Sequence, residues 1–172
     1  MTSLLLSVLA RMHRAQSATE FAAARPNCWL VWEPGVWKPP TKDGETLATL
    51  SVPTPPPAVG EALALALTPR AGQPGQITLG RAASCDVEIN DATLSQLHLL
   101  FMEASPRVWT VRDAGSRNGS WVDQAPLAKG VPLQLKSGSR IQAAQVCLTY
   151  YDPPGLYDRL FTLTRTPSRL QL

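Results

Sequence analysis

Residues 109–122 read WTVRDAGSRNGSWV, and this stretch decides the fold class. Apolar and polar side chains alternate over its first four letters, which is the period-two pattern of a half-buried β-strand. Gly115 interrupts the alternation, and the NG pair that follows favours a tight turn. We therefore expect one strand over 108–113, a polar loop, and a second strand over 119–123.

The same pattern continues from residue 61 onwards, with short apolar segments separated by turn residues. Many short strands separated by turn signals every 8–12 residues are typical of an all-β sandwich or barrel. The alternating apolar residues are expected to form its core: Val87, Ile89, Leu99, Phe101, Trp109 and Val111. The expected strands lie within 61–68 and at 76–80, 86–89, 97–102, 108–113, 119–123, 131–135, 139–143 and 145–151.

Composition divides the chain into four parts. Residues 1–37 form an N-terminal helical and tryptophan-rich segment, and residues 38–60 form a linker rich in proline and threonine. Residues 61–151 form the β-sandwich, and residues 152–172 form a C-terminal helix and tail that begins at a pair of prolines. Proline is favoured in the first turn of a helix, which places the start of the last helix there.

The N-terminal segment has its own signals. Ser17 followed three residues later by Glu20 is a capping box, which predicts the start of a short helix. Trp29, Trp32 and Trp37 lie within nine residues of each other. Either they cover an apolar face of the main domain, or they form an exposed docking patch, because aromatic residues dominate interface hot spots.

Charge and cysteine usage exclude several classes of protein. The net charge of +3 is spread evenly along the chain, without the clustered basic stripe that a nucleic-acid binder shows. Cys28, Cys85 and Cys147 include no CxxC pair, so neither a zinc site nor a disulfide framework is expected, and a reducing cytoplasm fits best. The apolar stretch 4–10 is too short for a membrane span, and its positive charges follow it, unlike those of a signal peptide.

Two blocks on expected loops carry the chemistry. Residues 79–98 contain a GR turn, the strand CDVEI and the loop SQLH, and residues 109–122 contain the strand WTVRD followed by GSRNG. Together these elements resemble the forkhead-associated (FHA) domain in content, order and spacing. The resemblance covers residues 77–151 and implies an FHA-like β-sandwich of about 10–11 strands, with short N-terminal helices and a C-terminal helix.

The resemblance also implies a ligand, which is phosphothreonine on another protein. A phosphate brings a charge of about −1.5 to −2 and three acceptor oxygens, so its site needs cations, hydroxyls and N–H groups that converge on one point. The residues implied to contact the phosphopeptide are Arg81, Ser95, Gln96, Ser116, Arg117 and Asn118. The residues implied to support the binding loops are Gly80, His98 and Gly119.

An enzymatic role is not expected. Ser95 and His98 suggest a catalytic pair, but two residues three apart at the start of a strand point in opposite directions, and no nucleophile elbow is present. No glycine-rich nucleotide loop and no cluster of metal ligands is visible, so no cofactor or metal is expected. For Arg81, an ion pair with Asp91 or Asp113 is the alternative to ligand contact.

The leading hypothesis is an adaptor in Ser/Thr kinase signalling, whose partners are threonine-phosphorylated proteins such as a kinase or its substrate. Gln96 departs from the family pattern, because Arg or Lys commonly follows the loop serine. That departure favours the alternative of a phosphate-independent interaction scaffold with a weakened phosphate site. A further alternative is self-recognition, in which Thr46, Thr49 and Thr54 are kinase targets bound by another copy of the chain.

Overall fold

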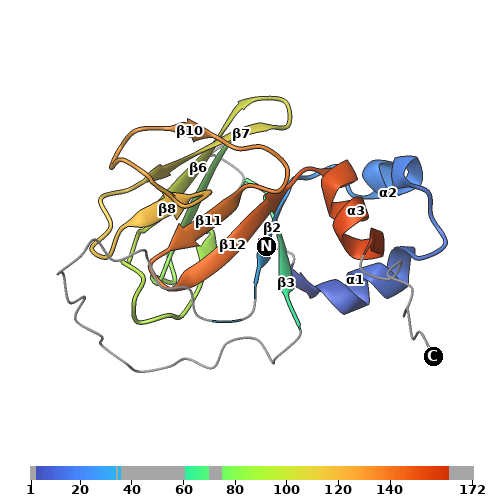
Figure 1. The fold of residues 1–172 in the computed structure, drawn as a ribbon, viewed down its shortest axis with the longest axis horizontal. Helices are drawn as coiled ribbons and strands as arrows, with labels where there is room; N and C mark the ends of the chain where they lie inside the picture. The colour runs from blue at the N-terminus through green and yellow to red at the C-terminus, as the bar shows by residue number, and fades with distance from the viewer. Residues whose placement is uncertain (1–2, 34, 36–60, 70–74, 163–172) are drawn as a thin grey trace, which may run out of the picture.

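Two β-sheets face each other in a computed structural model that describes residues 3–33, 35, 61–69 and 75–162 (Figure 1). The larger sheet has the strand order β1 (Ser3–Leu5), β3 (Leu63–Ala66), β2 (Trp29–Trp32), β12 (Val146–Tyr151), β11 (Arg140–Ala143), β8 (Ser120–Val122) and β9 (Ala125–Pro126). The smaller sheet has the order β10 (Leu133–Gln134), β7 (Val108–Asp113), β6 (Leu99–Ser105), β4 (Gln76–Gly80) and β5 (Val87–Glu88). The expected all-β sandwich is confirmed.

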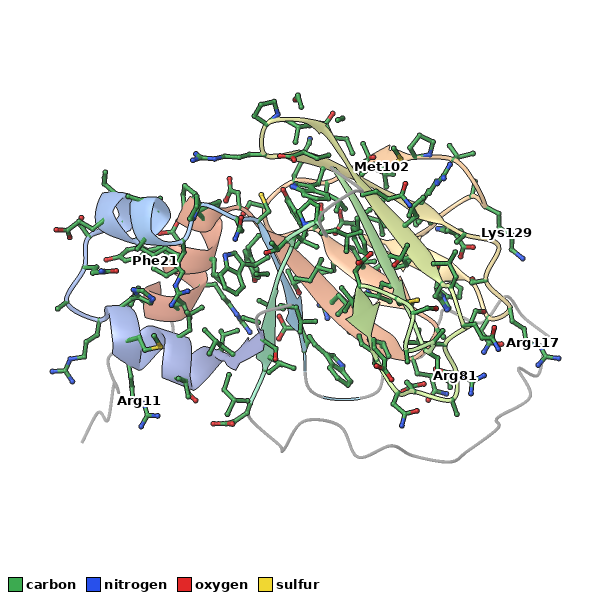
Figure 2. The ribbon with its side chains drawn as sticks, turned by 180° about the vertical axis from the view of Figure 1, so that it is seen from behind. Arg11, Phe21, Arg81, Met102, Arg117 and Lys129 are labelled. Carbon is green, nitrogen blue, oxygen red and sulfur yellow. The ribbon has the colours of Figure 1, made fainter. Side chains whose placement is uncertain are left out.

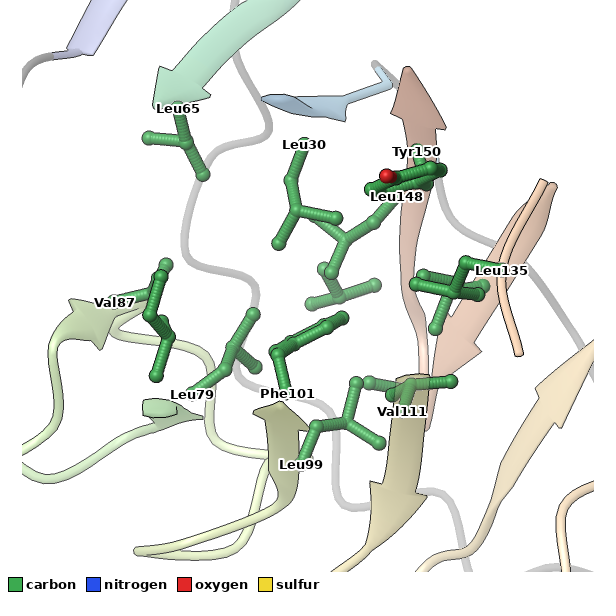
Figure 3. Close-up of a cluster of buried hydrophobic side chains, with 14 of the residues drawn as sticks. Leu30, Leu65, Leu79, Val87, Leu99, Phe101, Val111, Leu135, Leu148 and Tyr150 are labelled. Carbon is green, nitrogen blue, oxygen red and sulfur yellow. The ribbon is translucent and has the colours of Figure 1, made fainter. Parts of the chain in front are cut away.

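The main core fills the space between the two sheets (Figure 3). In β7 the side chains of Trp109, Val111 and Asp113 are buried, whereas the two residues between them are partly exposed. This is the alternation that the sequence predicts. All six expected core residues are buried, and they pack against Leu30, Leu148 and Tyr150 of the opposite sheet.

Three helices cover the outer face of the larger sheet at its β1–β3–β2 side: α1 (Leu6–His13), α2 (Ala18–Ala24) and α3 (Pro153–Thr162). Phe21 and Leu156 of these helices pack with Trp29 in a second apolar cluster. The Ser17–Glu20 capping box at the start of α2 is confirmed, since each side chain bonds the other residue's backbone N–H. None of these helices suits a bilayer span, because the longest has ten residues against the roughly 20 required.

The N-terminal segment contributes more to the sandwich than its composition indicates. β1 and β2 both come from residues 1–37, and β2 lies in the middle of the larger sheet, between β3 and β12. Trp29 is buried against the helices and Trp32 packs on the main core, so the covering role is confirmed for these two tryptophans. Trp37 and the linker 38–60 lie outside the described residues.

Candidate functional site

Three loops meet at a single end of the sandwich. The backbone N–H of Arg117, in the loop after β7, donates to the hydroxyl of Ser95 at 2.9 Å. The amide of Asn118 donates to the carbonyl of Thr93 at 2.7 Å. The backbone N–H of Arg81, in the loop after β4, donates to the carbonyl of Ser95 at 3.0 Å. These hydrogen bonds join three loops that are distant in sequence.

Gly80 makes the close approach of two of these loops feasible. A Cβ at this position would lie 2.1 Å from the carbonyl oxygen of Gln96, where the chain passes directly beside β4. The same carbonyl accepts a hydrogen bond from the N–H of Ala82 at 3.1 Å. Only glycine leaves room for this backbone contact, so Gly80 fixes where Arg81 leaves the strand.

His98 ties two loops together from inside the protein. It is fully buried; its Nδ1 accepts from the Ser95 N–H and its Nε2 donates to the Gly119 carbonyl, both at 3.1 Å. Because a backbone N–H only donates and a carbonyl only accepts, the ring is neutral with its proton on Nε2. Burial is the main cause that lowers the pKa of His98. The His98 ring bonds the backbone of Ser95 and not its hydroxyl, as an architectural role requires.

This arrangement predicts a specific pH dependence of stability. The unfolded chain protonates this histidine below about pH 6.5, whereas the folded chain keeps His98 neutral to lower pH. Neutral His98 therefore contributes fully to the free energy of unfolding above about pH 6.5. As the pH falls towards the pKa of His98 in the folded protein, the free energy of unfolding decreases by at most about 1.4 kcal/mol per pH unit. Urea unfolding between about pH 8 and pH 5 measures it. The His98→Gln variant should show a smaller slope, and an unchanged slope would assign the effect to other groups.

Asp113 organises the loop that follows β7. Its Oδ1 accepts from the N–H groups of Gly115 at 2.8 Å and Ser116 at 2.6 Å, and its Oδ2 accepts from the hydroxyls of Ser116 at 2.6 Å and Ser120 at 2.5 Å. Burial alone would raise the pKa of Asp113, but these hydrogen bonds outweigh it and lower the pKa below its ordinary value. A buried anion with four donors holds the loop in one conformation.

Ser116 therefore differs from its expected role as a ligand contact. Its side chain is fully buried, and its hydroxyl donates to Asp113 and accepts from the N–H of Gly119 at 3.0 Å. Both functions of the hydroxyl are used inside the protein, so Ser116 supports the loop. Sequence reasoning missed the role of Asp113, although the alternation of β7 signals it by placing this carboxylate on the core face with Trp109.

Gly119 closes the same loop. Its φ of +80° lies in the left-handed region that favours glycine, and a Cβ there would lie 3.1 Å from the ring of Trp121. Its carbonyl accepts from His98 and from the N–H of Ala144, at 3.1 Å each. Gly119 thus links the loop after β7 to the β11–β12 turn.

The remaining polar groups face solvent at this end. Arg81, Gln96, Arg117 and Asn118 are exposed, and Ser95 is partly exposed. Figure 2 shows Arg81 and Arg117 at the same end of the molecule, opposite Arg11.

Among the residues that the structure describes, neither guanidinium has an ion-pair partner. The alternative partners of Arg81 are engaged elsewhere: Asp113 is buried, and Asp91 binds the N–H and hydroxyl of Thr93 at 2.8 and 2.5 Å.

The chemistry of this set is anion binding. Two guanidinium groups, a hydroxyl and a carboxamide are the donors that a phosphate dianion requires. Within the described ranges no group of three or more His, Cys, Asp or Glu side chains is placed to hold a metal ion. The partly exposed Ser95 hydroxyl lacks an adjacent base in this part of the chain, because His98 bonds the Ser95 backbone instead.

Comparisons with known proteins place the site in a family context. The family model of the FHA domain matches residues 77–144. The FHA domain of an Arabidopsis thaliana hypothetical protein is similar in structure, with a TM-score of 0.50 at 22% identity over 73% of this chain and 85% of that chain. An FHA structure from work on phosphothreonine-dependent interactions has a TM-score of 0.48, at 18% identity over 73% and 95% of the two chains. The MEK1 FHA domain, bound to a phosphothreonine peptide of HOP1, has a TM-score of 0.40, at 22% identity over 45% and 79%.

Proposed function

We propose, starting from the fact that this chain carries an FHA domain, that it binds threonine-phosphorylated proteins as an adaptor in Ser/Thr kinase signalling. FHA domains generally bind phosphothreonine peptides. The observation that carries the proposal is the junction of Ser95 with the Arg117 backbone, beside the exposed Arg81. The Ser95 hydroxyl accepts from Arg117 and keeps its own proton to donate to a phosphate oxygen.

Each exposed group has a proposed task. Arg81 and Arg117 neutralise the phosphate, and arginine offers a forked pair of N–H donors that matches phosphate geometry. Asn118 already donates to Thr93, so its carbonyl oxygen is the group that accepts a backbone N–H of the peptide. Gln96 contributes an uncharged amide. The matched residues contain a binding module, and a binding role needs no catalytic group.

Fluorescence titration with three versions of one peptide tests the proposal. The phosphothreonine version should bind at least tenfold more tightly than the phosphoserine version. This preference requires that the loops also hold the extra methyl group of threonine, with a contribution of about 1.4 kcal/mol, which is within the roughly 1–3 kcal/mol that a methyl-sized pocket supplies. The unphosphorylated version should bind more weakly still. Equal binding of phosphorylated and unphosphorylated peptides would contradict the proposal. The double variant R81A/S95A separates an adaptor, which loses its partner, from the alternative scaffold, which keeps it.

Gln96 predicts a gain of function. The Gln96→Arg variant should bind the phosphothreonine peptide about tenfold to a hundredfold more tightly, since a charge-assisted hydrogen bond contributes about 1.5–3 kcal/mol. Gln124, an exposed residue in the β8–β9 turn at the other end of β8, offers a matched control. Gln124→Arg adds the same charge and should leave the affinity unchanged. No gain in Q96R would mean that position 96 does not face the phosphate.

A further inference from the structure

Asn118 and Gly119 form a chemically labile pair at the tip of the loop after β7. An asparagine followed by glycine is prone to cyclise, because glycine has no side chain to hinder the approach of its backbone nitrogen to the asparagine amide. The chain has two other asparagines, Asn27 and Asn90, and all three are exposed. Only Asn118 is followed by glycine, since cysteine and aspartate follow the other two.

The reaction of this pair needs only water. The backbone nitrogen of Gly119 loses its proton and attacks the side-chain carbonyl carbon of Asn118. A carbon–nitrogen bond forms, the bond from that carbon to the amide nitrogen breaks, and the amide nitrogen takes up the proton and leaves as ammonia. Water then opens the cyclic imide at either of its two carbonyls. The product is aspartate, or isoaspartate, whose backbone runs through the former side chain and is longer by a carbon.

Hydrogen bonds hold both reacting groups in the folded loop. The Gly119 N–H, whose nitrogen would attack, donates to the Ser116 hydroxyl at 3.0 Å. The Asn118 amide, which would be attacked, donates to the Thr93 carbonyl at 2.7 Å. Ser116 is itself fixed, because its hydroxyl donates to the buried Asp113 carboxylate at 2.6 Å. Cyclisation requires the bonds of both reacting groups to break, so the loop must first open.

Neither product fits the site as asparagine does. In aspartate a carboxylate oxygen replaces the amide donor opposite the Thr93 carbonyl, and two acceptors cannot bond, so this link between two loops is lost. The new negative charge also follows Arg117, which Figure 2 shows at the same end as Arg81, and it repels a phosphate dianion. In isoaspartate the longer backbone displaces Gly119, whose carbonyl accepts from the buried His98.

We propose that Asn118 is a site of spontaneous deamidation, which the hydrogen bonds of its loop restrain and whose products switch off phosphothreonine binding. The loss of binding rests on the proposed function, whereas the deamidation itself does not. The open fraction of the loop sets the rate, so a change that weakens the contact between Asp113 and Ser116 accelerates the reaction. The lifetime of the binding site therefore depends on the stability of this one loop.

Mass spectrometry of the full-length chain measures the reaction. A protease that cleaves before aspartate releases residues 113–122, which include Asn118 and no other asparagine. Aspartate at position 118 adds a cleavage site and isoaspartate does not, so the two products are distinguishable. Deamidation should be at least about tenfold slower in the folded chain than in the same chain unfolded in guanidinium chloride, because only the open fraction reacts. In the unfolded chain, Asn27 and Asn90 should react more slowly than Asn118.

The Ser116→Ala variant tests the restraint directly. It leaves the Gly119 N–H without its acceptor, so deamidation of the folded variant should be about tenfold faster than that of the unmodified protein. Ser105→Ala is the matched control, because it removes an exposed hydroxyl at the end of β6 and should leave the rate unchanged. The comparison of folded with unfolded chain involves no substitution, so it tests the restraint even if S116A does not fold.

Titration with a phosphothreonine peptide tests the loss of binding. As the folded protein ages, its binding capacity should fall in step with the deamidated fraction. Asn118→Asp reproduces one product and should bind the peptide about tenfold to a hundredfold more weakly. Asn27→Asp adds the same charge just before β2, at the end of that strand away from the β11–β12 turn, and should bind as the unmodified protein does.

Three results would overturn the inference. Equal deamidation rates in the folded and unfolded chains would mean that the loop does not restrain Asn118. Undiminished binding by aged, deamidated protein or by N118D would mean that the products do not switch off the site. Either result would leave the proposed function standing. A fresh protein that binds no phosphothreonine peptide would overturn the proposed function and, with it, the loss of binding.

Discussion

The Arg81→Ala variant is expected to bind a phosphothreonine peptide about tenfold to a hundredfold more weakly than the unmodified protein. Its exposed guanidinium has no ion-pair partner in the described part of the chain, so its donors are available to the phosphate. A charge-assisted hydrogen bond contributes about 1.5–3 kcal/mol, and each 1.4 kcal/mol changes affinity tenfold. Calorimetric titration of both proteins with one peptide measures the difference.

Arg11 provides the matched control for this experiment. It is an exposed arginine on α1, and Figure 2 shows it at the opposite end of the molecule from Arg81. The Arg11→Ala variant removes the same charge and should bind as the unmodified protein does. If R11A and R81A weaken binding equally, the effect reflects the net charge of the protein, and the prediction that Arg81 contacts the phosphate is wrong. The thermal midpoint of R81A should not change, because the side chain supports no described structure.

The Asp113→Ala variant is expected to lose about 3–5 kcal/mol of folding free energy. The substitution leaves two backbone N–H groups and two serine hydroxyls without their shared acceptor, and each buried donor without a partner costs about 1–3 kcal/mol. A loss of this size is a large fraction of the stability of a small domain. Urea unfolding at neutral pH measures it.

Asp158 serves as the control, since it is an exposed aspartate on α3. Asp158→Ala should change stability by no more than about 0.5 kcal/mol. Peptide affinity should fall in the Asp113 variant as well, because Asp113 positions the loop that carries Arg117. If D113A is as stable as D158A, the hydrogen-bonded carboxylate does not organise the loop, and the account of that loop is wrong.

Local patterns made much of the fold predictable. The alternation of β7 and the turn residues that follow depend on neighbours in sequence, so the strand over 108–113 has the bounds that were predicted. The strand over 76–80 is likewise confirmed at both ends. The capping box of α2 is a signal of four consecutive residues, and its hydrogen bonds confirm it.

Pairings between distant residues were not predictable in the same way. β1 pairs with β3 across about sixty residues, and no local pattern announces which partner a short apolar segment finds. β9 consists of only two residues, Ala125 and Pro126. Both are exposed, so the strand shows no alternation of buried and exposed side chains. The proline-rich linker made residues 1–37 look separate from the sandwich. Amino-acid composition shows where such a linker lies, but it does not show that β2, before the linker, pairs with β3, after it.

The candidate site also had a predictable part and an unpredictable part. The types of residue that bind an anion could be named from the sequence, because charge and hydrogen-bonding capacity belong to the side chain itself. Which of two neighbouring residues turns inward depends on the loop: Ser116 is buried, whereas Arg117 beside it is exposed. The difference follows from Asp113, whose buried carboxylate accepts a hydrogen bond from the Ser116 hydroxyl. The next side chain, Arg117, then points to solvent.

The central claim is that three loop tips form one phosphothreonine site, and an NMR titration tests it most directly. A phosphothreonine peptide should shift the backbone amide resonances of residues 81–82, 95–96 and 116–119 together, along a single binding curve, while the resonances of α1–α3 stay in place. The same peptide without phosphate should leave all of them unshifted. Shifts confined to the outer sheet faces or the helices, or loops that respond at different peptide concentrations, would contradict the account.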